Sequence, residues 1–159
     1  MQRQSRLIHV ILIVLAGLFG DQLTKMIARH YLEGRVTTHF LFNTIQFQYV
    51  ENHGGFLGYF NILPEPFRFY VLTFGVGSLL FMSLYLLITT AKFSDSQCIF
   101  LSFIIAGGLG NLLDRLINNG GVIDFISIGI GPLRSGIFNF ADALILACSF
   151  GLGMSLTRD

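Results

Sequence analysis

Charged residues are scarce in this chain of 159 residues, since Asp, Glu, Lys and Arg make up 12% of it against 53% hydrophobic residues. The ten Lys and Arg are scattered and the formal net charge is +1, so no basic stripe is present that would bind nucleic acid. Proline is also rare, with 3 residues, and the mean hydropathy is +0.68. These values are typical of a membrane protein, and the length allows one domain.

Residues that bind metals are few and dispersed. The two cysteines, Cys98 and Cys148, lie in apolar runs without a C-x-x-C motif, so the sequence indicates neither a disulfide framework nor a zinc site. No H-E-x-x-H motif is present either, which disfavours a zinc protease. The histidines are His9, His30, His39 and His53.

Four apolar stretches are long enough to be membrane-spanning helices, and they cover residues 7–28, 67–90, 97–117 and 137–156. No small-x-small cleavage site follows the first stretch, so we interpret it as a retained span and not as a signal peptide. The sequence therefore predicts an α-helical membrane protein with four transmembrane helices in a single domain, residues 1–159. Both termini then lie on one side, which the positive-inside rule favours as the cytoplasmic side.

The stretch between the first two spans, residues 31–66, differs from the rest. Residues 44–49 alternate polar and apolar side chains, which is typical of a half-buried strand, and Asn52-His53-Gly54-Gly55 then predicts a turn. We expect a small β-rich subdomain that lies on the membrane surface, with an aromatic face turned toward the lipid headgroups. This face comprises Phe47, Tyr49, Phe56, Tyr59 and Phe60.

Polar residues within the spans are concentrated near one end of each. Asp21 and Lys25 lie one helical turn apart in the first span, in the order that favours an ion pair. The third and fourth spans carry Asn111, Asp114, Arg115, Asn139 and Asp142. With four spans all of these residues meet at the outer membrane face, and ionisable groups at membrane depth usually mark function.

Asp124 and Asp142 differ from the other carboxylates because apolar residues surround them and no basic residue lies within four positions of either. Two carboxyl groups held together at low dielectric cannot both ionise easily, so the pKa of one rises and the pair shares a proton. Such a pair can work as acid and base. The ionised member takes a proton from a water that attacks a carbonyl, while the protonated member hydrogen-bonds the developing oxyanion.

Five motifs occur in a fixed order: Asp21-Gln22-Leu23-Thr24-Lys25, Asn52-His53-Gly54, Gly110-Asn111-Leu112-Leu113-Asp114-Arg115, Val122-Ile123-Asp124-Phe125 and Phe138-Asn139-Phe140-Ala141-Asp142. With this order and spacing, about residues 8–156 resemble the lipoprotein signal peptidase (signal peptidase II) family. The resemblance implies an aspartic endopeptidase of the bacterial inner membrane that cleaves diacylglyceryl-modified prolipoproteins before the lipidated cysteine. It implies no metal and no cofactor.

The resemblance also assigns roles to residues. Asp124 and Asp142 would be the catalytic pair, at the periplasmic face, and Asp114 would be structural. The supporting and substrate-binding residues would be Asp21, Lys25, Asn52, Gly54, Asn111, Arg115, Asn139 and Ala141. A β-rich cradle would lie between the first two spans, and a short periplasmic helix or loop between the last two. The expected partners are lipid-modified prolipoproteins and membrane lipids, and we expect a monomer.

One departure from the family pattern leaves alternatives open. Gly55-Phe56-Leu57 stands where the pattern resembles Ala-Ala-Phe, which is compatible with altered substrate choice or with an inactive paralogue that binds precursors. The same carboxylates could also serve a proton-coupled carrier or a Mg²⁺-dependent transferase. The sequence shows no internal symmetry of the kind that carriers have, and few clustered carboxylates for a transferase.

Overall fold

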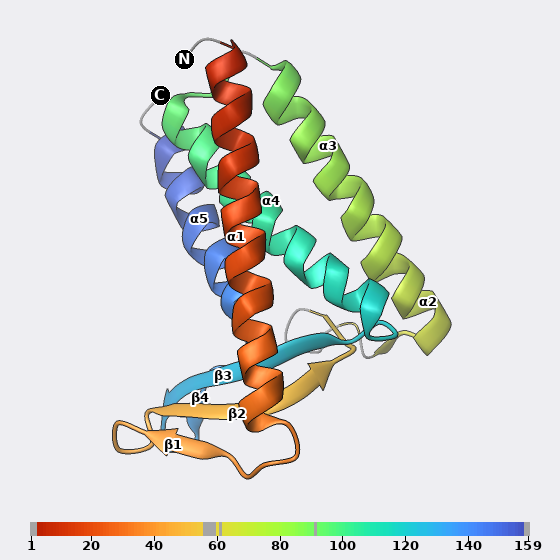
Figure 1. Cartoon of the computed structure of the whole chain (residues 1–159), viewed down its shortest axis with the longest axis vertical. Helices are drawn as coiled ribbons and strands as arrows, with labels where there is room; N and C mark the ends of the chain where they lie inside the picture. Colours follow the sequence, from red (N-terminus) through yellow and green to blue (C-terminus); the bar gives the residue numbers. More distant parts are fainter. Residues whose placement is uncertain (1–2, 56–59, 61, 91, 158–159) are drawn as a thin grey trace.

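The computed structural model describes residues 3–55, 60, 62–90 and 92–157. In chain order the elements are α1 (Arg3–Leu32), β1 (Thr38–Phe40), β2 (Ile45–Asn52), α2 (Glu65–Tyr70), a π-helical turn (Val71–Gly75), α3 (Val76–Thr89), α4 (Asp95–Ile117), β3 (Val122–Ile130), β4 (Leu133–Arg134) and α5 (Phe140–Leu156). Figure 1 shows the long helices side by side, with the sheet at one end of them. The start of α1 and the end of α5 lie at the opposite end.

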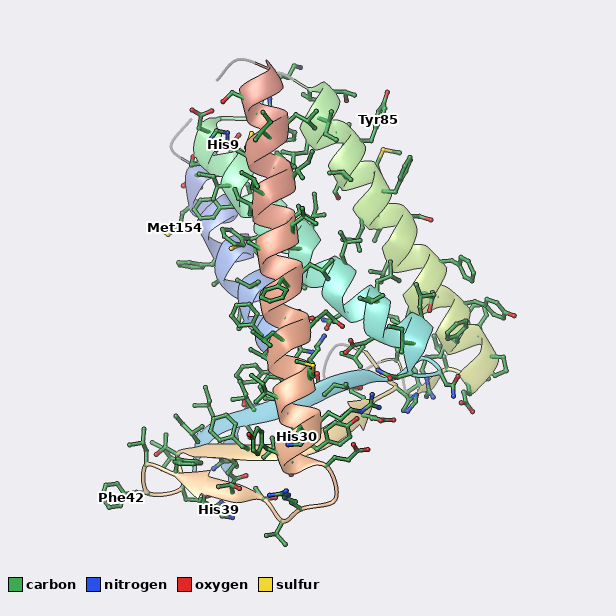
Figure 2. All side chains as sticks on the ribbon, viewed as in Figure 1. His9, His30, His39, Phe42, Tyr85 and Met154 are labelled. Atoms are coloured by element: carbon green, nitrogen blue, oxygen red, sulfur yellow. The ribbon has the colours of Figure 1, made fainter. Side chains whose placement is uncertain are left out.

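Among the described residues, three helices are long and apolar enough to cross a membrane. They are Ser5–Leu32, Glu65–Thr89 and Asp95–Ile117. A fourth helix, α5, is apolar but has only 17 residues. The outer surface of the helices is itself apolar: Phe19, Phe74 and Phe81 are 69%, 62% and 72% exposed, which suits contact with lipid. Tyr85 and Met154 likewise point away from the other helices (Figure 2).

Glycines allow α4 to approach its neighbours closely. A Cβ atom at Gly107 would lie 2.7 Å from the carbonyl oxygen of Ala141 in α5. A Cβ at Gly108 would meet the side chain of Leu80 in α3, and one at Gly110 would press on the Asp21 carboxylate in α1. Small residues at helix contacts are typical of membrane proteins, because they let backbones pack against each other. α4 is therefore the helix against which the other three pack.

The sheet has four antiparallel strands in the order β1-β2-β3-β4. The strand predicted from the alternation in residues 44–49 is confirmed, since β2 covers Ile45–Asn52. It pairs with β3, where Ile45 lies opposite Ile128, and an irregularity between Phe47 and Val50 shifts the register. The last turns of α1 pack on the sheet through a cluster that contains Ala28, Ile123 and Phe125. The sheet is thus attached to the helices by its own apolar side chains.

Half of the sheet comes from a part of the chain where no strand was predicted. β3 and β4 lie between α4 and α5, so the prediction of a short helix or loop there is wrong. Ile-rich Val122–Ile130 has residues that favour strands, but it is pairing with β2, far away in sequence, that makes it one. Of the expected aromatic face, Phe56 and Tyr59 lie outside the described residues, while Phe47 and Tyr49 pack against the Ala28 cluster.

Gly107→Ala tests the close approach of α4 and α5. The added methyl group would meet a backbone oxygen, which cannot rotate away, so we expect a loss of about 1–3 kcal/mol in the free energy of unfolding. Gly153→Ala, in α5, is the control because nothing lies within 4 Å of its added Cβ. Thermal unfolding in detergent should show a lower midpoint for Gly107→Ala only. Equal midpoints would mean that α4 and α5 do not pack as described.

Candidate active site

The N-terminus of α5 holds Asp142 in place. Asn139 is the N-cap residue of this helix and is fully buried. Its Oδ1 accepts a hydrogen bond from the backbone N–H of Asp142 at 2.9 Å, and Asp142 Oδ2 accepts one from the backbone N–H of Asn139 at 3.2 Å. This reciprocal capping box fixes the Asp142 carboxylate at the positive end of the helix dipole.

Asp124 reaches the same place from β3. Its side chain is buried, with 2% of the residue exposed. Asp124 Oδ1 accepts a hydrogen bond from Asn139 Nδ2 at 2.7 Å, and Oδ2 accepts one from Asn52 Nδ2 at 2.9 Å. Asn139 therefore contacts both aspartates, and the structure brings Asp124 and Asp142 into one hydrogen-bonded site. We call these two residues the dyad.

Asn111, on α4, links the dyad to α1. Its Nδ2 donates to Asp142 Oδ1 at 2.9 Å. Its Oδ1 accepts from Asn139 Nδ2 at 3.0 Å and from Lys25 Nζ at 2.9 Å. Both polar atoms of the Asn111 amide are thereby used, so its orientation is set by partners on α1 and at the start of α5.

Lys25 is the centre of a buried ion cluster beneath the dyad. Its Nζ lies 2.8 Å from Asp21 Oδ2 and 3.0 Å from Asp114 Oδ2, and these three residues form what we call the buried triad. Gln22 Nε2 also donates to Asp114 Oδ1 at 3.0 Å. A buried charge is tolerated only when it is paired and hydrogen-bonded, and Lys25 meets both conditions.

The two carboxylates of the buried triad also bind backbone groups next to the dyad. Asp21 Oδ1 accepts from the N–H of Ala141 at 3.0 Å, one residue before Asp142. Asp114 Oδ2 accepts from the N–H of Ile123 at 3.0 Å, one residue before Asp124. The triad therefore positions the backbone of both dyad residues.

The turn after β2 forms another side of the site. Asn52 Oδ1 accepts from the N–H of Gly54 at 3.0 Å, which orients its amide toward Asp124. Gly55 has a φ of +58°, and a Cβ there would lie 3.1 Å from Leu72 and 3.7 Å from Arg115 Nη2. Arg115 is buried, and its Nη1 donates to the carbonyl oxygen of Asn111 at 3.3 Å.

Burial determines the protonation of Asp124. Removal from water raises the pKa of the Asp124 carboxyl to about 7. The negative charge of Asp142 raises this pKa as well, whereas the hydrogen bonds from Asn52 and Asn139 and the positive charge of Lys25 lower it. Asp124 is therefore a carboxyl group that exchanges its proton near neutral pH.

Every residue to which the resemblance assigns a role lies in this network. The structure places Asp21, Lys25, Asn52, Gly54, Asn111, Asp114, Arg115, Asn139 and Ala141 around Asp124 and Asp142. Gln22 was not predicted as a site residue, although its place next to Asp21 was a signal. In the described part of the chain no group of three or more His, Cys, Asp and Glu side chains could hold a metal ion.

Comparisons with known sequences agree on one family. The model of the family described as signal peptidase (SPase) II matches residues 13–158. The lipoprotein signal peptidase of Thermodesulfovibrio yellowstonii is 38% identical, over 79% of this chain and 78% of that protein. That of Caldanaerobacter subterraneus is 34% identical, over 90% and 92%. A bacterial membrane enzyme solved by the in meso method has a TM-score of 0.80 and 26% identity, over 95% of this chain and 88% of that one.

Lys25→Met tests the buried triad. It leaves two buried carboxylates without their cation, so we expect a loss of about 3–5 kcal/mol in the free energy of unfolding. Arg29→Met, one turn further along α1, is the control, because Arg29 is exposed and lies 3.7 Å from Glu33 and 3.6 Å from Glu51. Its expected effect is about 0–1 kcal/mol. Chemical unfolding in detergent gives both values, and similar losses would contradict the role of the triad.

Proposed function

The chain belongs to the signal peptidase II family, and we propose that it is an aspartic endopeptidase that removes signal peptides from diacylglyceryl-modified prolipoproteins before the lipidated cysteine. Asp124 and Asp142 are the proposed catalytic residues. The observation that carries this proposal is the position of Asn139, which hydrogen-bonds to the carboxyl groups of both. Asn139 thus holds two carboxyl groups from different elements at one reaction centre.

The two carboxyl groups have different surroundings, and we propose different roles for them. Both oxygens of Asp142 accept hydrogen bonds, Oδ1 from Asn111 Nδ2 and Oδ2 from the Asn139 N–H at the start of α5. Asp124 is more deeply buried and holds its proton up to about neutral pH, since its pKa is raised to about 7. The protonated carboxyl group of Asp124 can still accept a hydrogen bond, and its O–H group can donate one.

In the proposed reaction water is the nucleophile, and no covalent bond forms between the enzyme and the substrate. Ionised Asp142 takes a proton from a water molecule, whose oxygen bonds to the scissile carbonyl carbon. Protonated Asp124 donates a hydrogen bond to the oxyanion that develops there. When the carbon–nitrogen bond breaks, Asp142 passes its proton to the leaving amine of the lipidated cysteine. The products are a peptide with a new terminal carboxyl group and the free amine of the lipidated cysteine.

The fold supports a location for this reaction at the outer face of the bacterial inner membrane, with both termini in the cytoplasm. The dyad lies where α4 and α5 meet the sheet, and the start of α1 and the end of α5 lie at the other end of the helices (Figure 1). A lipidated substrate held in the outer leaflet would present its cleavage site at this depth. We propose that the enzyme works there as a monomer.

The departure from the family pattern at residues 55–57 falls on the turn and not on the dyad. Glycine suits position 55, because its φ is positive and a Cβ would crowd Leu72. Phe56 and Leu57 lie outside the described residues. Since every group of the dyad network is present, we propose catalysis and not only precursor binding.

Asp124→Asn and Asp142→Asn test the dyad. An amide can neither accept the proton from water nor supply an acidic proton, so each variant should process a lipidated precursor roughly 10²–10⁴-fold more slowly or not at all. A gel-shift assay of the precursor measures this, with thermal unfolding as a check of the fold. Glu33→Gln, which changes an exposed carboxylate in the turn that follows α1, should process at the wild-type rate. Wild-type rates in either Asp variant would falsify the assignment.

The pH dependence tests which aspartate carries the proton. Because only protonated Asp124 can donate to the oxyanion, kcat/KM should fall as the pH rises through about 7. Asn52→Ala removes a hydrogen bond that lowers the Asp124 pKa, so in this variant the fall should move to higher pH. Initial rates of precursor processing, measured from about pH 5 to about pH 9 so that they bracket this pKa, test both expectations. A loss of rate without such a move would assign the proton to another group.

A further inference from the structure

Two turns at one end of the sheet expose large apolar side chains. Leu41 and Phe42, in the turn between β1 and β2, are 68% and 105% exposed. Ile130 and Leu133, in the hairpin between β3 and β4, are 78% and 83% exposed. We call these four residues the apolar tip. The turn between β1 and β2 lies at the end of the sheet that is far from α2 (Figure 1), and Phe42 points outward from it (Figure 2).

Hydrogen bonds hold the two turns of the apolar tip side by side. Arg134 Nη1 donates to the carbonyl oxygen of Asn43 at 2.8 Å, and Arg134 Nη2 donates to that of Thr44 at 3.2 Å. The N–H of Gly129 also donates to the Thr44 oxygen, at 2.9 Å. Two segments that are distant in sequence therefore present their apolar side chains together.

The turn between β1 and β2 has an unusual backbone. Leu41, Phe42 and Asn43 have φ angles of +48°, +54° and +68°, and bulky residues rarely adopt this left-handed conformation. Asn43 Oδ1 stabilises the turn, because it accepts a hydrogen bond from Gln46 Nε2 at 2.8 Å and lies 2.7 Å from His39 Nδ1. The turn is thus fixed in a strained shape that keeps Phe42 away from the rest of the protein. Strain of this kind is typical of functional segments.

The apolar face of the sheet beside the tip is the face that packs on α1. Phe47 and Ile126 pack against the cluster that contains Ala28 of α1. Ile45 and Ile128 lie opposite each other, two residues further along the same strands, so they share this face. Ile128 is 46% exposed. Since α1 is long and apolar enough to cross a membrane, the lipid around α1 lies on the side of the sheet that carries Ile128.

The composition of this end of the sheet suits lipid better than water. No Asp, Glu, Lys or Arg occurs in residues 36–50 or 125–133. The opposite face of the outer strands is polar, since His39 lies opposite Gln46. An element with one polar and one uncharged apolar face is typical of segments that lie in the membrane interface.

We propose that the apolar tip inserts into the headgroup layer of the leaflet at the sheet end of the helices and anchors β3 there. Ile130 of the tip and Asp124 of the dyad both lie on β3, roughly 20 Å apart at ~3.3 Å per residue. The depth of the tip in the leaflet therefore sets the height of Asp124 above the membrane. This contact surface differs from the aromatic face expected from the sequence, because Phe47 and Tyr49 of that face pack against the Ala28 cluster. The link to Asp124 rests on the proposed function, whereas the insertion does not.

Tryptophan fluorescence of the full chain in phospholipid vesicles tests the insertion. The chain has no tryptophan, so Phe42→Trp introduces a single fluorophore at the tip. Lipids with brominated acyl chains should remove at least about half of its emission, because interfacial segments lie ~5–10 Å into the boundary between headgroups and acyl chains. His39→Trp, on the polar face, is the control and should lose little emission. Equal quenching of the two variants, or none in Phe42→Trp, would overturn the proposal.

Phe42→Gly tests the link between the tip and the dyad. Glycine suits a φ of +54°, so the thermal midpoint of this variant in detergent should equal or exceed that of the wild type. In vesicles it should process a lipidated precursor at least about threefold more slowly, since small displacements of a catalytic group are costly. In detergent, where no flat leaflet sets the height of β3, the two proteins should process at equal rates.

The combination of unchanged or higher stability with slower processing in vesicles separates loss of the anchor from damage to the fold. Equal rates of the two proteins in vesicles would overturn the link to Asp124, and slower processing in detergent as well would assign the loss to the site itself. If the wild type cleaves no precursor, the proposed function fails, while the fluorescence of Phe42→Trp still decides whether the tip inserts.

Discussion

The rest of the site depends on one buried cation. Lys25 Nζ lies within 3.0 Å of both Asp21 and Asp114, and 2.9 Å from Asn111 Oδ1. Each of the two carboxylates in turn binds a backbone N–H just before a dyad residue. Without the ammonium group these carboxylates could not stay charged while buried, and they would no longer fix the two backbone segments. A single side chain on α1 thus determines how α5 and β3 face each other.

Asn139 links the carboxyl groups of the two dyad residues through hydrogen bonds. As N-cap of α5 it is needed for the helix to begin, and its amide donates to Asp124 and Asn111 at the same time. The two aspartates consequently have unequal surroundings. Asp142 belongs to a helix N-terminus that favours negative charge, whereas Asp124 belongs to a buried strand where burial dominates its pKa. This inequality arises from the elements on which they lie.

Local patterns in the sequence predicted what depends on local physics. The apolar stretches predicted the long helices, the polar and apolar alternation of residues 44–49 predicted β2, and the spacing of Asp21 and Lys25 predicted their ion pair. The strand β3 was missed because it exists through pairing with β2, where Asn52 lies opposite Val122 and Ile45 opposite Ile128, and not through its own composition. A cavity beside Arg115 could not be predicted from the sequence either, because its walls come from α2, α4 and two loops.

Backbone N–H groups that lie away from water need hydrogen-bond partners, and this constraint applies at both dyad residues. The N–H groups concerned are in the first turn of α5, which carries Asp142, and in β3, which carries Asp124. In α5 the free N–H groups of the first turn bind Asp21 and Asn139, and in β3 the N–H of Ile123 binds Asp114. The groups that satisfy the backbone are therefore the groups that hold the dyad. A substitution among them would disturb folding and chemistry together, and Asp142 is one of them, because its Oδ2 accepts the Asn139 N–H in the capping box of α5.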